Sequence, residues 1–483
     1  MKEAFVVIDI GSGNTRVAVV EASGKILSIA KENTVFYTDH EVYCGQYFLP
    51  EEWRSNIFRL IRQAVAQAGA VRLLAICPIT IRQGIVLIGK DGRSLIGYSN
   101  ADRRGQPYMQ EFDWDRITQL TGLSPSGIYS AIKVVGAKHL SPELLEQTRY
   151  YTSVSDWIGY LLTGKCVWEK AQAMQSCLYD AVTEDWSEEI CRIMGLDQNQ
   201  LPALADCGTI LGMVKPEICR ELGLQEPIPC VVGTADTQAA LAAACPEPGD
   251  VVIVSGTTSP CLKVTPRFHP YPKSWVSPTI DPGRYMLEVN TASCGINVQR
   301  FRNVMMPDVS YEELAADALQ RGMPEKNLPE VLAVFSPGLH LDRVTPDGGF
   351  VMRSPISLSM HRYDFFHAMV LNTALSVTMC LQRMKELDGL DKPYLIGSGG
   401  GFASPVAGQA VADLMDMPVK IYENYRESAV CGGLILCCRA MGWQIPRWRE
   451  WKVLQPRHSE ALQEYFSQWK EARMAFQQLN FQE

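Results

Sequence analysis

The sequence predicts an α/β fold with two lobes that face a shared ligand. An apolar run followed by a glycine turn rich in hydroxyl groups occurs three times, at residues 5–16, 251–259 and 394–401. Helical patterns lie between these runs, and strands that alternate with helices are typical of α/β architecture. At 483 residues the chain is too long for one core, since a domain has about 100 to 200 residues. Turns in both halves therefore predict two lobes.

Helices and a linker separate these strands. Apolar side chains recur at helical spacing over residues 53–65 and again over 366–379, which predicts one long helix in each half. Two prolines and a glycine within 245–250 end one helix before the next strand, so we place a domain boundary there. The predicted domains are residues 1–245, residues 246–441 and a helical tail, residues 442–483, that packs on a lobe.

Composition and charge disfavour several classes of protein. The chain is 47% hydrophobic and 20% charged, as expected of a folded globular protein. Its 15 cysteines form no C-x-x-C pair, which disfavours a zinc or redox motif and predicts reduced core thiols in a cytoplasmic protein. A net charge of −8 argues against a nucleic-acid partner. No stretch reaches the ~20 uncharged apolar residues of a membrane span, so we expect no membrane partner.

The first glycine turn follows a strand that ends on a carboxylate, Asp9. Backbone N–H groups of such a turn can bind phosphate, because glycine permits a close approach. The Walker A pattern is absent, and the third glycine of a dinucleotide fingerprint would fall at Arg16, which disfavours a dehydrogenase. Asp9 fits a carboxylate that holds Mg²⁺ beside a nucleotide phosphate. The alternative is an ordinary turn aspartate before glycine.

A second candidate acid, Asp236, stands between a glycine turn and an alanine-rich helix. Capping of that helix would by itself explain a carboxylate here. A kinase of small alcohols, however, needs a carboxylate that orients the attacking hydroxyl and accepts its proton. Asp236 is therefore a helix cap or a general base.

The order of the motifs is more specific than any one of them. Asp9-x-Gly-x-x-x-x-Arg16, Gly-x-x-Asp236 and Ser-Gly-Thr-Thr-Ser at 255–259 are followed by Gly-Gly-Gly-Phe-Ala-Ser at 399–404 and an acid with small residues at 427–433. This order resembles the FGGY carbohydrate kinases, of the superfamily that includes chaperone ATPases and actin. The resemblance implies two ribonuclease-H-like lobes (the actin/Hsp70/sugar kinase fold) with an interlobe cleft. It also implies the cofactors ATP and Mg²⁺, and phosphoryl transfer to a sugar or polyol hydroxyl.

The resemblance also assigns roles to single residues. Asp236 would be the general base, and Asp9 and Asp236 would hold the metal. The N-terminal domain would bind substrate and phosphates, and the C-terminal domain would bind adenosine. The residues that would contact ATP are Gly11, Ser12, Gly13, Asn14, Thr15, Arg16, Gly256, Thr257, Gly399, Gly400, Gly401 and Ser404.

Substrate recognition is expected in the N-terminal domain. Arg82 and Gln83 lie in a segment that resembles the sugar-contacting part of family members, and Asp102 lies where many carry Trp-x-Asp-x-Arg. We predict that these three residues and Asp236 bind the substrate, because fork donors and carboxylates suit vicinal hydroxyls. The alternatives are a solvated charge run at residues 103–104 and a turn role for Asp102.

The pattern around Arg82 is most similar to the autoinducer-2 kinase branch, which implies a small open-chain or flexible polyhydroxy substrate. Asn100 replaces the tryptophan of the motif, and Asn372 stands where glutamate is frequent, so the substrate class does not transfer from better-known members. A non-catalytic sugar or nucleotide binder is the alternative, although retention of both Asp9 and Asp236 weighs against it. A chaperone-type ATPase would need a peptide-binding domain, for which we expect no room. The oligomeric state is open, with a homodimer as one option.

Overall fold

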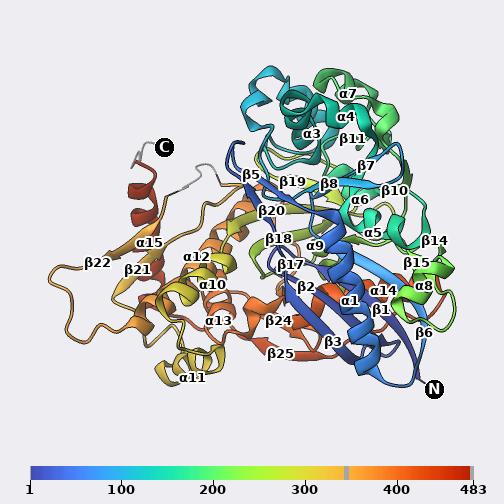
Figure 1. Cartoon of the computed structure of the whole chain (residues 1–483). Coiled ribbons are helices and arrows are strands. Elements are labelled where there is room, and N and C mark those ends of the chain that lie inside the picture. Colours follow the sequence, from blue (N-terminus) through green and yellow to red (C-terminus); the bar gives the residue numbers. More distant parts are fainter. Residues whose placement is uncertain (1, 342–346, 479–483) are drawn as a thin grey trace.

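The computed structural model describes residues 2–341 and 347–478, and two seven-stranded sheets form the centres of its two lobes (Figure 1). The strands of the N-terminal sheet are, in spatial order, β14 (Ile210–Met213), β15 (Pro229–Val231), β6 (Val71–Thr80), β1 (Lys2–Ile10), β2 (Asn14–Glu21) and β3 (Ile26–Asn33), with β16 (Thr234–Ala235) also paired to β6. Those of the C-terminal sheet are β19 (Trp275–Pro278), β20 (Tyr285–Ser293), β18 (Thr258–Thr265), β17 (Val251–Val254), β23 (Leu395–Ser398), β24 (Val419–Tyr422) and β25 (Glu450–Leu454).

The two sheets share one topology. In the first, β1, β2 and β3 are antiparallel, and β1 runs parallel to β6, which runs parallel to β15. In the second, β17, β18 and β20 are antiparallel, and β17 runs parallel to β23, which runs parallel to β24. The two-lobed α/β architecture is therefore confirmed, with one strand order built twice.

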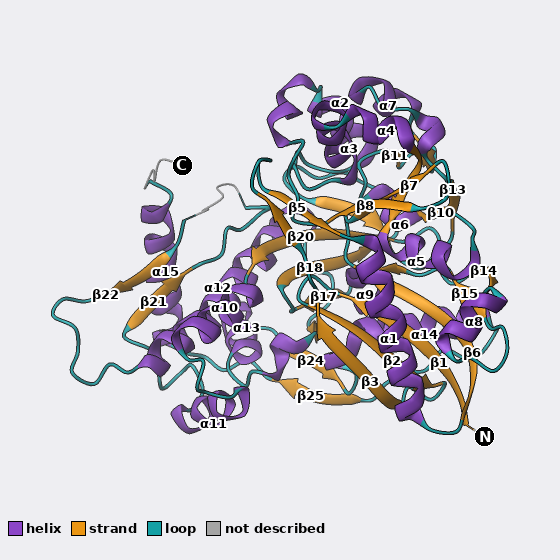
Figure 2. Ribbon diagram, viewed as in Figure 1, coloured by secondary structure: helices purple, strands orange, loops and turns teal. Residues whose placement is uncertain are grey.

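Smaller sheets and the helices complete each half, and α2, α3, α4 and α7 gather beside a five-stranded sheet (Figure 2). The smaller sheets consist of β4 (Tyr37–Asp39), β5 (Gly45–Phe48), β8 (Ser94–Tyr98), β7 (Ile85–Gly89) and β9 (Thr148–Ser153); β10 (Val167–Glu169) and β13 (Ala203–Ala205); β11 (Tyr179–Asp180) and β12 (Asp185–Trp186); and β21 (Val331–Val334) and β22 (Gly349–Met352). The helices of the N-terminal half are α1 (Pro50–Ala68), α2 (Trp114–Thr121), α3 (Ser130–Leu140), α4 (Pro142–Gln147), α5 (Val154–Thr163), α6 (Lys170–Met174), α7 (Glu188–Met194), α8 (Pro216–Leu222) and α9 (Asp236–Ala243). Those of the C-terminal half are α10 (Gly295–Met305), α11 (Tyr311–Arg321), α12 (Arg362–Asp388), α13 (Ala407–Met415), α14 (Ser428–Ala440) and α15 (Glu460–Phe476). Short 3₁₀ turns span Gln106–Glu111, Gln198–Gln200, Gly400–Ala403 and Tyr425–Glu427.

The middle of the first strand, residues 4–8, is apolar on both faces because helices cover both of them. Val6 and Ile8 pack in a cluster with Trp53 of α1, whereas Phe5 and Val7 face the other way and pack in a cluster with Val430 of α14. Successive side chains of a strand point to opposite faces, so a strand covered on both sides has no polar alternation. The helix predicted over residues 53–65 is α1, and its apolar stripe fills one of these clusters.

Two helices lie between the sheets of the two lobes. Helix α9 contributes Ala239 to the N-terminal cluster and Leu241 to a cluster with Val252 of the C-terminal sheet. Helix α14 follows the C-terminal sheet in the chain but packs on β1 and β6 of the N-terminal sheet. The helices approach closely at Gly432, where a Cβ would lie 2.1 Å from the Ala239 carbonyl oxygen.

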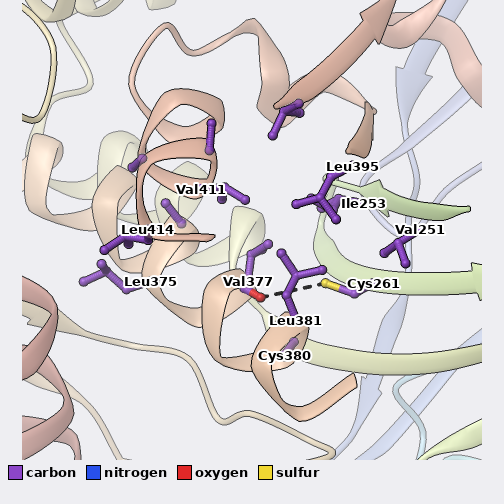
Figure 3. Packing of buried hydrophobic residues seen from close by; sticks show 14 of the residues in the cluster. Val251, Ile253, Cys261, Leu375, Val377, Cys380, Leu381, Leu395, Val411 and Leu414 are labelled. Carbon is purple, nitrogen blue, oxygen red and sulfur yellow. Dashed lines mark hydrogen bonds between the residues drawn. The ribbon is translucent and has the colours of Figure 1, made fainter. Parts of the chain in front are cut away.

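The core of the C-terminal lobe packs around α12. Leu375 and Leu381 of this helix belong to one buried cluster with Ile253 and Leu395 of the sheet and Val411 of α13 (Figure 3). This is the helix predicted over residues 366–379. Within the described residues, α12 is the one helix long and apolar enough to cross a membrane by length and composition, which the sequence expectation missed, but most of its apolar window is buried in the protein.

The tail differs from its prediction, because it is not helical throughout. Residues 450–454 form β25, which pairs antiparallel with β24 and so becomes the edge strand of the C-terminal sheet. Helix α15 follows and packs on the same lobe. Its Trp469 donates a hydrogen bond to the Ala333 carbonyl at 2.9 Å and one to Asn372 Oδ1 at 3.2 Å. Asn372 thus has a structural role in the core, as the anchor of α15.

Replacement of Trp469 by alanine should therefore destabilise the protein. The indole is fully buried, and its removal leaves a cavity and removes one hydrogen bond each from the Ala333 carbonyl and Asn372 Oδ1. We expect the free energy of unfolding to fall by about 3–5 kcal/mol in urea denaturation. Met474→Ala, an exposed position on the same helix, serves as the control and should change it by less than about 0.5 kcal/mol. A loss below about 1 kcal/mol for Trp469→Ala would contradict the anchoring role.

Candidate functional site

A cavity of about 470 Å³ lies between the two lobes. Its lining includes residues 11–14 after β1, residues 254–258 after β17, Gly399 and Gly400 after β23, and Asp236 at the start of α9. The three glycine turns of the sequence meet here because the parallel central strands of a sheet end at the same edge. The structure thus confirms the interlobe cleft.

Asp9 and Arg16 face each other across β1 and β2 at the edge of the cavity. Arg16 Nη2 lies 2.5 Å from Asp9 Oδ2, and Arg16 Nη1 lies 2.8 Å from Glu427 Oε2, directly before α14. Burial raises the pKa of Asp9, and the Arg16 guanidinium opposes this rise. Arg16 therefore joins a buried carboxylate of one lobe to a carboxylate from the other half of the chain.

The phosphate-binding prediction for residues 11–16 fits the cavity except at Thr15. Ser12 Oγ lies 3.5 Å from Thr257 Oγ1, so the turns of the two lobes touch across the cleft. Asn14 and Arg16 line the cavity, whereas Thr15 points to the opposite face of β2 and its hydroxyl contacts Thr34 Oγ1 at 3.1 Å. This follows from the alternation of side chains along a strand, so Thr15 does not reach a ligand in the cleft.

Asp236 is the first residue of α9 and lines the cavity. Its Oδ1 accepts hydrogen bonds from the backbone N–H of Thr237 at 2.7 Å and from the Thr237 hydroxyl at 3.2 Å. Burial raises the pKa of Asp236 to about 6, the Arg82 guanidinium opposes this, and the charge of Asp9 adds to it. A carboxylate with a pKa in this range can accept a proton near neutral pH.

The C-terminal glycine turn packs against the loop after β17. Gly399 has φ +90°, and a Cβ there would lie 2.4 Å from the Ser255 carbonyl oxygen. The Gly401 N–H donates to that oxygen at 2.9 Å, and a Cβ on Gly401 would lie 2.0 Å from Ser255 Oγ. Both positions therefore require glycine, because any larger side chain would push the two loops apart.

Behind this turn, a second cavity of about 470 Å³ is largely apolar. Tyr311, Phe366 and Ser404 contribute to its lining. Two buried polar atoms of lining residues, His367 Nε2 and Thr373 Oγ1, have no hydrogen-bond partner in the described structure. Burial lowers the pKa of His367 to about 4, so its imidazole is neutral. An apolar pocket with a few polar atoms is a suitable binding site for a planar heterocycle.

Arg82 reaches the cleft from the loop after β6 and forms a buried interlobe ion pair. Its guanidinium makes two hydrogen bonds with Glu288 of β20, at 2.5 and 3.0 Å, and lies 5.5 Å from the ring centre of Trp275. Burial alone would raise the pKa of Glu288, but the pair with Arg82 holds it below the ordinary value. Asn290 donates a further hydrogen bond to Glu288 at 2.7 Å.

The other two predicted substrate residues lie differently. Gln83 lines the cavity, has φ +58° and donates to Gln175 Oε1 at 2.9 Å. Asp102 is fully buried and absent from the cavity lining. Its oxygens accept hydrogen bonds from Arg104 Nε and Nη2, both at 3.0 Å, and from the Gln46 N–H at 2.7 Å. The geometry therefore does not support direct substrate contact by Asp102, which instead fixes the loop whose Asn100 lines the cleft.

Several residues of the site, in the cavity lining or paired with it, carried no signal in the sequence. Glu288 and Trp275 lie about 200 positions beyond Arg82, and no local pattern connects them to it. His367 sits within the apolar helical stretch predicted over residues 366–379. They can be recognised as residues of the site only in the folded structure, where the two lobes meet.

The cleft can hold a magnesium ion together with phosphate groups. Asp9 and Asp236 are the carboxylates that line it, and the described residues contain no cluster of three or more histidine, cysteine or acidic side chains that could hold a metal alone. Mg²⁺ is commonly bound by one or two carboxylates, with phosphate oxygens and water completing its octahedron. The residues present therefore fit Mg²⁺ that arrives with a nucleotide.

Comparisons with known proteins agree on one family. Residues 4–243 match the N-terminal domain, and residues 251–441 the C-terminal domain, of the FGGY family of carbohydrate kinases. The "Putative sugar kinase YoaC" of Bacillus subtilis is 30% identical over 477 residues, which cover 98% of each chain. An "Autoinducer-2 kinase" of Yersinia enterocolitica is 25% identical over 478 residues, 91% of this chain and 88% of the relative.

Solved structures show the same fold. The glycerol kinase of Plasmodium falciparum with ADP superposes with a TM-score of 0.81 at 17% identity and covers 99% of both chains. A match of this quality over nearly the whole chain means that the two proteins share one fold.

Proposed function

The chain belongs to the FGGY family of carbohydrate kinases, and on that premise we propose that it transfers the γ-phosphoryl group of ATP to a hydroxyl of a small sugar, ketose or polyol, with Asp236 as the general base. The observation that carries the proposal is the position of Asp236. Its carboxylate lines the cavity that the glycine turns of both lobes enclose, and its pKa is raised to about 6. In the proposed reaction, Asp236 accepts the proton of the substrate hydroxyl as that oxygen attacks the phosphorus.

ATP would bind along the C-terminal side of the cleft. The apolar cavity with Ser404 would hold adenosine, and the turns at residues 399–401, 256–257 and 11–14 would surround the phosphates. Asp9 and Asp236 would hold Mg²⁺, which neutralises charge that develops on the phosphates. Arg16 would lie beside the same phosphates, as its position at the edge of the cavity suggests. Closure of the two lobes would exclude water, which competes as an acceptor.

The acceptor would bind on the N-terminal side. Arg82, held rigidly by Glu288, and the side chain of Gln83 line this side together with Asn100. Rigid donors and acceptors suit a polyhydroxy chain, because adjacent hydroxyls can be bound by paired hydrogen bonds. Similarity to a protein named autoinducer-2 kinase supports a small open-chain substrate. We also propose a cytoplasmic site of action, since all 15 cysteines are free thiols.

Release of ADP from ATP and Mg²⁺ across a panel of pentoses, ketoses, polyols and an autoinducer-2 precursor tests the proposal. A carbohydrate kinase releases ADP quickly only when its acceptor is present. Fast release without any acceptor would indicate an ATPase instead. ATP binding without release for any compound would favour the alternative, a non-catalytic regulator that has kept the fold.

A variant of His367 tests the position of the nucleobase. Because its imidazole is neutral and Nε2 lacks a partner in the pocket, we propose that it hydrogen-bonds the base. His367→Leu should raise the Kd for ATP about tenfold in calorimetry and should leave the KM for the acceptor unchanged. His458→Leu, which removes an exposed imidazole, should have no effect. An unchanged ATP affinity in His367→Leu would contradict this placement.

A further inference from the structure

The loop that follows β8 contains two consecutive arginines, of which one is buried and the other exposed. Arg104 is buried, is paired with Asp102 at 3.0 Å and lies 3.7 Å above the centre of the Tyr98 ring. Arg103 is exposed, lines the cleft and has no ion-pair partner among residues 2–341 and 347–478. The run at residues 103–104, for which a solvated charge run was the alternative in the sequence analysis, therefore consists of one structural arginine and one arginine at the cavity.

A second cation lies behind this loop. Lys133 of α3 is fully buried, and its Nζ donates to the carbonyl of Ile128, whose residue also lines the cleft. No carboxylate lies within ion-pair distance of Lys133 in the described structure. Burial lowers the pKa of Lys133 to about 7, the charge of Asp102 opposes this, and the charges of Arg103 and Arg104 lower it further. Arg103, Arg104 and Lys133 thus lie near one another beside Asp102, and the charge of Asp39 also acts on Tyr98 beneath Arg104.

The other arginines of the cavity are already occupied or lie on the nucleotide side. Arg16 is paired with Asp9, and Arg82 with Glu288. Arg426 contacts the Tyr425 hydroxyl, beside the glycine turn that contacts ATP in our proposal. On the acceptor side, Arg103 is thus the lining cation that no carboxylate of the described part of the chain neutralises.

We infer that the acceptor is a sugar acid, whose carboxylate binds the Arg103 guanidinium while a hydroxyl elsewhere on the carbon chain faces Asp236. This inference rests on the proposed function and names its substrate class. A carboxylate fits the fork of a guanidinium with two parallel hydrogen bonds, and an arginine that lines a cleft without an ion-pair partner in the described structure is open to an anionic ligand. A singly charged carboxylate matches the single free arginine. A dianionic phosphate ester would add further charge to a cleft that already receives ATP.

A pair of matched substrates distinguishes the effect of the carboxylate charge on kcat/KM from that of the carbon chain. An aldonate and the alditol of the same length and stereochemistry differ in one terminal group, so kcat/KM for the pair measures the contribution of the carboxylate. We expect the aldonate to be preferred at least tenfold. Arg103→Gln should lower kcat/KM for the aldonate about 10- to 100-fold and change that for the alditol by no more than about twofold. Arg93→Gln, at an exposed turn outside the cleft, is the matched control and should change neither value.

Binding measurements keep this inference distinct from the proposed activity. Aldonate binding to the wild-type protein, measured by calorimetry, should weaken at least tenfold in Arg103→Gln and should weaken with added salt. If neither compound is phosphorylated but the aldonate binds through Arg103, the activity assignment fails and the carboxylate site stands. Three results would overturn the carboxylate site. They are a preference for the alditol, an equal effect of Arg103→Gln on both compounds, and tighter binding of the corresponding sugar phosphate.

Discussion

Asp236→Asn should lower kcat by about 10²- to 10⁴-fold, the contribution typical of a general base in proton transfer. Asparagine keeps the shape of the side chain but cannot accept the proton of the attacking hydroxyl. The affinity for ATP should fall by a smaller factor, because the glycine turns, the apolar cavity and Asp9, the other carboxylate proposed to hold Mg²⁺, are unchanged. ADP release under saturating ATP and acceptor measures the loss.

The pH dependence gives this prediction a second readout. The pKa of Asp236 is raised to about 6, so the residue is an ionised base above this value and is protonated below it. The kcat/KM of the wild-type protein should therefore fall about tenfold per pH unit as the pH decreases below about 6. This fall in kcat/KM with decreasing pH should be absent from the residual activity of Asp236→Asn. Asp115→Asn, an exposed carboxylate on α2, should keep both the rate and the profile. An Asp236→Asn enzyme within tenfold of the wild type would exclude Asp236 as the base.

Arg82→Met should destabilise the protein by about 3–5 kcal/mol, because it leaves the Glu288 carboxylate buried without its cation. The loss of stability should grow as the pH rises. Once Arg82 is gone, burial raises the pKa of Glu288 in the folded state above its unfolded value, so the folded state binds the extra proton. Stability is then retained at pH 5 and lost as the pH rises through that pKa. Urea denaturation at pH 5 and pH 8 measures the difference.

The double variant Arg82→Met/Glu288→Met separates charge from packing. Removal of both charged groups should restore most of the stability, since apolar side chains of similar volume can replace a buried ion pair. Activity should stay low in the single and the double variant if Arg82 also contacts the acceptor. A single variant as stable at pH 8 as the wild type would show that the pair does not join the lobes. The exposed pair of Arg116 and Glu189 offers a control, and Arg116→Met should cost less than about 1 kcal/mol.

The strands and the turns of this fold were predictable because their signals are local. The apolar run before Asp9 and the turn after it are consecutive in the sequence, and so are the helical stripes of α1 and α12. The order of such signals also placed Asp236 in the cleft. Residue types do not, however, reveal which face of a strand a side chain occupies. Thr15 therefore belongs to the predicted phosphate loop in sequence but not in space.

Contacts between segments that are distant in the chain could not be predicted from the sequence. Glu288 neutralises Arg82 from the other lobe, and Arg104 neutralises Asp102 within its own loop, so neither charge is as available as its residue type suggests. Arg103 is the opposite case, because the sequence left a solvated charge run open for it, whereas in the structure it lines the cavity. Pairing in three dimensions decides which charges remain for a ligand.

The placement of α14 determines how this chain can be divided into fragments. A fragment that ends near residue 245 would contain every strand of the first sheet and would lack the helix that covers Phe5 and Val7. The complementary fragment would carry α14 with its apolar face bare. Each fragment should therefore aggregate when produced alone, and co-expression of the two should restore a soluble, active pair. Although the lobes repeat one strand order, they are no longer independent folding units, because one helix of the second lobe completes the core of the first.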